Sequence, residues 1–93
     1  MQIAIIKWID STYYKVDFCE IKEELELIKP KNLYSVGMFI YEDEDCIVIA
    51  QDFEPDSESA RMLLTIPKCS ISSYIIKKIN IKSLKKKRKN NEL

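Results

Sequence analysis

Leu33 to Phe53, which reads LYSVGMFIYEDEDCIVIAQDF, is the stretch that decides the fold. Apolar side chains recur with a period of two on both sides of the acidic segment 43–45, as in two antiparallel strands joined by a tight turn. We therefore predict a β-hairpin with strands at 33–42 and 46–53. In its first strand, Ser35 and Gly37 share one face, and the other face carries the larger side chains of Tyr34, Val36, Met38 and Ile40.

Gly37 is the sole glycine of the chain and lies in the middle of the first hairpin strand. Glycine inside a strand costs stability, and it usually marks a bulge or a place where another backbone approaches closely. We expect a sharp bend of the strand at Gly37.

Short strands are also predicted on both sides of the hairpin. Residues 2–9 are rich in Ile, and residues 14–19 alternate apolar and polar side chains. The doublet Ile5-Ile6 breaks the alternation of the first strand, which predicts either burial on both faces or a bulge that turns Ile3, Ile6 and Trp8 inward. Residues 20–28 favour an irregular excursion or one short helix, because Lys29-Pro30 follows them. After the hairpin we expect strands at 61–66 and 71–81, the last with Ile75, Ile79 and Ile81 on one face.

Five or six short strands with tight turns are typical of a small all-β barrel. Their order is similar to that of an SH3-like barrel, in which Ser11 to Asn32 would form the long loop after the first strand. Residues 66–71 (IPKCSI) resemble the short 3₁₀ turn that precedes the last strand of that fold. An OB-like barrel is the alternative, because its five strands would leave a similar pattern. We assign residues 1–81 to the barrel domain and residues 82–93 to a disordered, flexible basic tail.

The zero net charge of the chain conceals two parts of opposite charge. Residues 1–76 contain 7 Lys or Arg and 14 Asp or Glu, whereas residues 77–93 contain 8 and 1. An acidic body repels phosphate and a basic tail attracts it. Any contact with nucleic acid or with an acidic partner is therefore expected to involve the tail.

Residue types that common catalytic and metal sites need are missing from the chain. It has no His, and Cys19, Cys46 and Cys69 form no C-x-x-C pair, which argues against a zinc site and a disulfide framework. Without a default general base or a glycine-rich phosphate loop, we expect no enzymatic activity and no cofactor. The acidic runs at 42–45 and 52–58 lack the spacing of a known cation loop and are interpreted as solvated turns.

The distribution of apolar residues predicts a soluble protein of the cytoplasm. No apolar run approaches the ~20 residues that a membrane-spanning helix needs. The N-terminal stretch has no positively charged lead and no small-residue cleavage site, so it does not resemble a signal peptide.

Aromatic side chains around the first loop are the candidate ligand-binding residues. Trp8, Tyr13 and Tyr14 lie near Asp10 in the sequence. Such aromatics stack on bases or grip a peptide, while a carboxylate accepts hydrogen bonds from a ligand. Trp8 alone is more often a core residue in a barrel of this size, so we expect the tyrosine pair to be the exposed part.

The C-terminal lysines are the candidate nucleic-acid-binding residues. Clustered cations bind phosphates without sequence preference, and no aromatic RNA-binding motif or recognition helix accompanies them. A solubilising extension with no ligand is the alternative interpretation. The residues are Lys77, Lys78, Lys82, Lys85, Lys86, Lys87, Arg88 and Lys89.

Three short motifs occur in a fixed order along the chain: Trp8-Ile9-Asp10-Ser11, Ser35-Val36-Gly37 and Thr65-Ile66-Pro67-Lys68. In that order they resemble a group of short, largely uncharacterised phage and prophage proteins with the pattern W-x-D-[AS], S-V-G and I-P-[KR]. The resemblance covers about residues 3–81 and implies a viral or prophage origin, hence the cytoplasm of an infected or lysogenic cell. It transfers no catalytic residue to this chain.

We therefore expect a non-enzymatic, phage-type accessory protein. In the leading hypothesis, a small β-barrel binds a host protein or sequesters a small ligand such as a nucleotide, as a homo-oligomer whose subunit boundary supplies concave volume. One alternative is non-specific nucleic-acid binding through the tail. The other is a virion structural component that assembles through an exposed strand edge.

Overall fold

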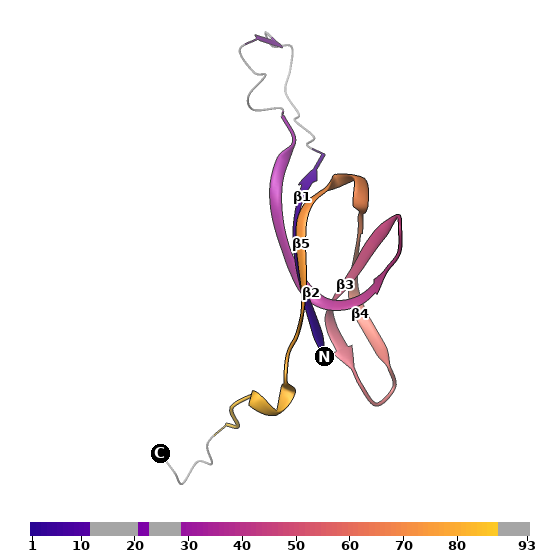
Figure 1. The fold of residues 1–93 in the computed structure, drawn as a ribbon, viewed down its shortest axis with the longest axis vertical. Helices are drawn as coiled ribbons and strands as arrows, with labels where there is room; N and C mark the ends of the chain where they lie inside the picture. Colours follow the sequence, from indigo (N-terminus) through magenta and orange to yellow (C-terminus); the bar gives the residue numbers. More distant parts are fainter. Residues whose placement is uncertain (12–20, 23–28, 88–93) are drawn as a thin grey trace.

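A computed structural model describes residues 1–11, 21–22 and 29–87 of the 93-residue chain. They form one five-stranded antiparallel sheet with the order β4-β3-β2-β1-β5 (Figure 1). Two short 3₁₀ turns, η1 and η2, lie before and after β5. The elements are β1 (Gln2–Asp10), β2 (Lys31–Glu42), β3 (Cys46–Glu54), β4 (Ser59–Pro67), η1 (Lys68–Ser70), β5 (Ile71–Lys78) and η2 (Ile81–Ser83).

The structure confirms the all-β class and the hairpin predicted at 33–53. The 3₁₀ turn predicted at 66–71 is η1. The sheet is open, because β4 and β5 form its two edges and do not pair with each other in the ladders of the described strands. The strand predicted at 14–19 lies outside the described residues, as does all but Ile21 and Lys22 of the possible helix at 20–28.

The long strand β2 belongs to both halves of the sheet. Its first part, residues 31–38, pairs with β1, and its last part, residues 38–42, pairs with β3. The register with β3 shifts between Phe39 and Tyr41, where the strand curves away from β1 (Figure 1). β2 therefore transfers the chain from one half of the sheet to the other.

Gly37 lies where β3 passes close to β2. A Cβ atom at this position would lie 2.9 Å from the backbone oxygen of Ala50 and 3.1 Å from Cβ of Ile49. The φ angle of Gly37 is not positive, so the position needs space and not a left-handed backbone. The glycine therefore marks a close backbone approach, whereas the irregularity of β2 lies further along the strand, between Phe39 and Tyr41, and not at Gly37, where the bend was expected.

A small apolar core fills the inner face of the curved sheet. β1 contributes two fully buried side chains, while Ile5 between them is 45% exposed. Trp8 and Phe39 are partly buried against this cluster. The buried residues of the cluster are Ala4, Ile6, Ile47, Ile49 and Ile66, and Ala50 on β3 is buried outside it.

Two expectations about strand faces and strand ends were wrong. β1 is neither buried on both faces nor bulged at Ile5-Ile6, because Ile5 is exposed and the irregularity in its pairing with β5 lies between Lys7 and Trp8. β5 ends at Lys78 and does not extend to residue 81. The backbone N–H of Ile79 donates to the carbonyl oxygen of Met1 at 2.8 Å, and the chain then turns into η2.

The close approach at Gly37 generates a stability prediction. We expect Gly37→Ala to lower the free energy of unfolding by about 1–3 kcal/mol, because the added methyl group forces β2 and β3 apart. Urea denaturation followed by Trp8 fluorescence measures the loss. The control is Gln51→Ala, an exposed position on β3; equal stability of the two variants would contradict the account.

Candidate functional site

Trp8 mainly packs against the apolar core. Its ring is partly buried against the core, and its Nε1–H donates to Oγ of Ser35 on the neighbouring strand β2 at 2.9 Å. Asp10 is half-buried at the end of β1, where its register partner is Lys31. Because residues 8 and 10 are two apart on one strand, they share a face of the sheet. Tyr13 and Tyr14 lie outside the described residues.

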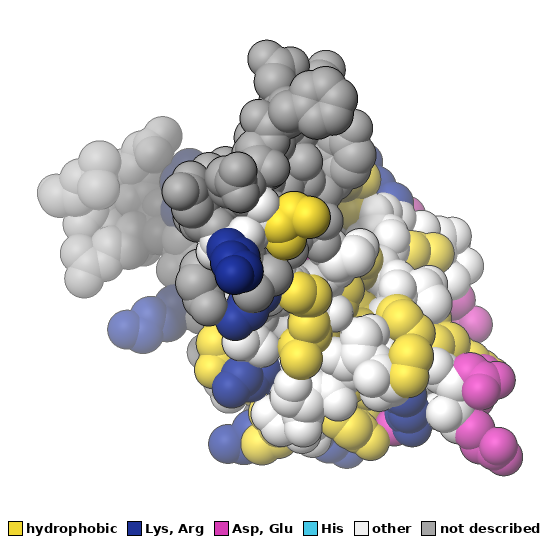
Figure 2. Space-filling view, turned by 90° about the horizontal axis from the view of Figure 1, so that it is seen from above, with side chains coloured by type: hydrophobic (Ala, Val, Ile, Leu, Met, Phe, Trp, Pro, Cys, Tyr) yellow, Lys and Arg dark blue, Asp and Glu magenta, His cyan; other side chains and the backbone are white. Residues whose placement is uncertain are grey.

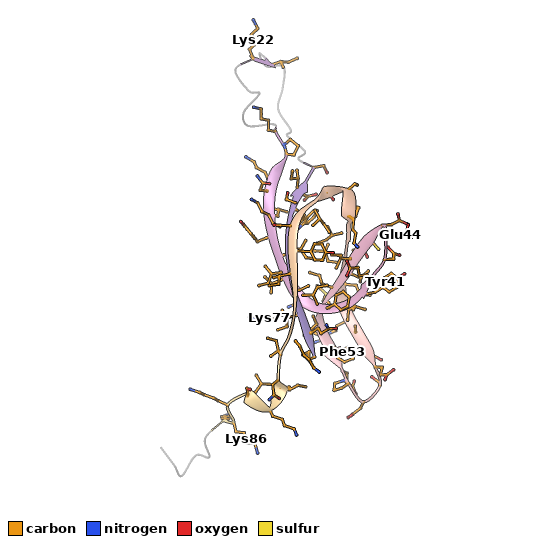
Figure 3. The ribbon with its side chains drawn as sticks, viewed as in Figure 1. Lys22, Tyr41, Glu44, Phe53, Lys77 and Lys86 are labelled. Atoms are coloured by element: carbon orange, nitrogen blue, oxygen red, sulfur yellow. The ribbon has the colours of Figure 1, made fainter. Side chains whose placement is uncertain are left out.

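The described lysines of the predicted nucleic-acid site follow one another along β5 and beyond it. Lys77 and Lys78 are exposed and, as consecutive strand residues, point to opposite faces of the sheet. Lys82 belongs to η2, and residues 85–87 continue the basic run (Figure 3). All six of these lysines are exposed: Lys77, Lys78, Lys82, Lys85, Lys86 and Lys87. Arg88 and Lys89 lie outside the described part of the chain.

Acidic side chains concentrate on the two hairpins that connect β2, β3 and β4. Figure 3 places Tyr41 and Glu44 on the opposite side of the molecule from Lys77 and Lys86. Figure 2 likewise shows the acidic side chains gathered at one side. Among the described residues, the acidic hairpins and the basic run are therefore also separated in space. The acidic residues on the hairpins are Glu42, Asp43, Glu44, Asp45, Asp52, Glu54, Asp56 and Glu58.

The acidic turn between β2 and β3 is organised by one carboxylate. Oδ1 of Asp43 accepts hydrogen bonds from the backbone N–H groups of Asp45 and Cys46 at 2.8 and 2.9 Å, and Oδ2 accepts from the hydroxyl of Tyr41 at 2.9 Å. These bonds, the backbone ones above all, lower the pKa of Asp43, and the bond to Asp43 raises the pKa of Tyr41. Within the described ranges, no group of acidic or thiol side chains could hold a metal ion.

A second polar cluster, which the sequence analysis missed, joins η1 and β5 to the end of β2. Oε2 of Glu42 accepts a hydrogen bond from the hydroxyl of Tyr74 and forms an ion pair with Nζ of Lys68, both at 2.7 Å. Nζ of Lys68 also lies 5.9 Å from the centroid of the Tyr74 ring. The bond from Lys68, followed by that from Tyr74, lowers the pKa of Glu42, and the same two bonds raise the pKa values of Lys68 and Tyr74.

The two cysteines among the described residues are free. Partial burial, together with the nearby Asp43, raises the pKa of the Cys46 thiol. A thiol with a raised pKa is a poor nucleophile at neutral pH. Cys46 is therefore not an activated thiol.

No protein-family model matches the chain, and no curated protein or solved structure matches it significantly. The resemblance to phage and prophage proteins stays a prediction. In the part of the chain that the structure describes, none of the helices has the length and apolar character needed to cross a bilayer.

The lowered pKa of Glu42 generates a pH prediction. A carboxyl whose pKa is lower in the folded state stabilises the fold above its ordinary pKa of 4.5, and this stabilisation is lost as the pH falls through the folded value. We expect the melting temperature of Glu42→Gln to fall less than that of the unmodified protein when the pH is lowered from 6 to 3. Melting curves followed by circular dichroism measure this dependence.

Glu44→Gln, an exposed position in the same turn, removes the same charge and is the control. Part of the pH dependence will persist in both variants, because Asp43 also has a lowered pKa. Parallel pH profiles for Glu42→Gln and the unmodified protein would show that the ion pair with Lys68 contributes nothing.

Proposed function

We propose that this chain is a small SH3-like β module that binds polyanions, nucleic acid in particular, through the end of β5 and the basic residues that follow it. The observation that carries the proposal is the run of exposed lysines at 77–87, which contains no acidic residue and lies apart from the acidic hairpins. A polyanion approaching such a molecule is attracted to one side and repelled by the other.

Two features support the SH3-like assignment over the OB-like one. The strand order β5-β1-β2-β3-β4, with β2 shared by two halves of the sheet, is the order expected of an SH3-like barrel. The 3₁₀ turn η1 joins β4 to β5, at the place where that fold has its short crossing.

The other functions expected from the sequence receive less support. Assembly through strand edges is disfavoured, because β5 carries Lys77 and Lys78, while β4 contains Met62 with a φ of 57° and ends at Pro67. Lysine, irregular backbone and proline are features that prevent edge-to-edge pairing. Trp8, the described aromatic of the predicted ligand site, already uses its indole N–H within the protein. Binding of a host protein and a phage-type accessory role stay predictions.

The salt dependence of binding tests the proposal. Each single-strand phosphate neutralised by a lysine adds about −0.7 to the slope of log affinity against log salt. We expect Lys85→Gln with Lys86→Gln to make that slope shallower by about 1.4 and to weaken binding at low salt. Fluorescence anisotropy with a labelled oligothymidylate, measured over a series of salt concentrations, gives both quantities.

A charge-matched control removes two lysines away from this run, Lys22→Gln with Lys31→Gln; Lys22 lies at the other end of the molecule (Figure 3), and Lys31 begins β2 opposite Asp10. This variant has the same net charge as the Lys85 and Lys86 variant. Equal slopes for the two variants would mean that binding follows net charge and not the proposed surface, and no binding by the unmodified protein would overturn the function.

A further inference from the structure

The outer face of strands β5, β1 and β2 carries exposed apolar side chains side by side. Residues directly opposite in an antiparallel ladder share a face, and here Ile5 lies between Val36 on β2 and Ile75 on β5. These side chains are 45%, 64% and 53% exposed, respectively. Three β-branched residues thus form an exposed row across three strands. In the described structure, about half of the surface of each of these side chains stays open to solvent.

An aromatic residue and a lysine form the adjacent row on the same face. Tyr34 on β2 is 71% exposed and lies directly opposite Lys7 on β1, which in turn faces Ser73 on β5. A shallow hollow of about 210 Å³ lies among these side chains. It is smaller than the ~300–1,000 Å³ of enclosed small-molecule sites, so it suits one part of a larger ligand. Its lining is Ile5, Lys7, Tyr34, Ser73, Tyr74 and Ile75.

The charges on this face are all of one sign. Lys7 lies on one side of the apolar row, and Lys77, the register partner of Ile3, lies on the other. Among the described strand residues that share this face there is no Asp or Glu: Ile3, Ile5, Lys7, Ile9, Asn32, Tyr34, Val36, Met38, Ser73, Ile75 and Lys77. Charge complementarity therefore favours an anionic ligand.

The size of the face favours a linear ligand. Three strands spaced ~4.8 Å apart and about six residue steps of ~3.3 Å give a flat area of roughly 300 Å². A stable interface between folded proteins needs about 800 Å² on each partner. This face is thus too small for a stable interface with a second folded copy of the chain. It is large enough for a linear polymer that crosses it in an extended conformation.

We propose that this face binds single-stranded nucleic acid, with a base stacked on Tyr34 and phosphates contacting Lys7 and Lys77. This inference rests on the proposed function and assigns the ligand class. Lys77 belongs to the face and also begins the basic run to residue 87 (Figure 3). A single nucleic-acid strand can therefore contact lysines on the sheet and then those that follow β5. The exposed ring of Tyr34 is an aromatic surface on which any base stacks, and Ile5 and Val36 beside it offer apolar contact. Duplex bases have no free faces, so only single strands gain from Tyr34.

The test compares a labelled oligothymidylate with a labelled blunt-ended duplex that has no unpaired bases, using the full-length chain and fluorescence anisotropy. We expect Tyr34→Leu to weaken binding of the single strand about thirtyfold, the middle of the range for loss of one stacked base. Binding of the duplex, which involves only the lysines, should change less than twofold. Tyr34→Trp should retain single-strand binding.

Tyr41→Leu is the matched control, because Tyr41 lies on the same strand and is also exposed but adjoins the acidic turn. If Tyr34→Leu lowers the affinity for both ligands equally, or for neither, then no base stacks on Tyr34, and the proposed function still stands. Failure of the unmodified protein to bind either ligand overturns the proposed function itself. Tighter binding of an acidic peptide such as oligoglutamate, weakened by Tyr34→Leu, would reassign the face to a protein partner.

Discussion

The fold depends on the close contact between the backbone at Gly37 and the backbone of β3. β2 can pair with β1 and then with β3 only if β3 approaches its inner face, and at Gly37 the backbone oxygen of Ala50 leaves no room for a side chain. A single missing methyl group therefore allows one strand to belong to both halves of the sheet. Both hairpins with their acidic residues, as well as the position of β4, follow from the direction that β2 takes after this contact.

The small core explains why a face of this sheet is open to a ligand. A chain of this length buries a limited share of its surface, and in the described residues the buried apolar cluster consists of Ala4, Ile6, Ile47, Ile49 and Ile66. The outer side of β5, β1 and β2 receives no covering layer from the described elements. The Ile and Val residues on this outer side favour strand formation, because β-branched side chains prefer the extended backbone. The same residues that stabilise these strands thus form the exposed apolar row.

The sequence predicted the features that arise from local patterns and missed those that depend on distant contacts. Period-two alternation and an acidic turn located the central hairpin, and the glycine marked the close approach. The last strand was predicted to extend to residue 81, because Ile79 and Ile81 continue the apolar period. In the structure β5 ends at Lys78, the backbone N–H of Ile79 donates to the carbonyl oxygen of Met1, and the chain then turns into η2. The cluster of Glu42 and Lys68 was missed because its residues are far apart in sequence. Tyr34 was assigned to a strand face, but alternation alone does not tell which face remains uncovered.

The pairing of β1 with both neighbours has a consequence for how the chain matures. Of the five strands of the sheet, β1 comes first in the chain, yet one of its partners is the last: residues 2–8 pair with residues 71–78. During synthesis, β1 can pair with β2 long before β5 exists, so its other edge presents unpaired backbone groups beside exposed Ile5. Such a nascent sheet is prone to association with other chains. β5 ends this exposure by pairing with the free edge of β1. The lysines that follow β5 are synthesised directly after it, so the basic run becomes part of the protein only when this edge can be paired.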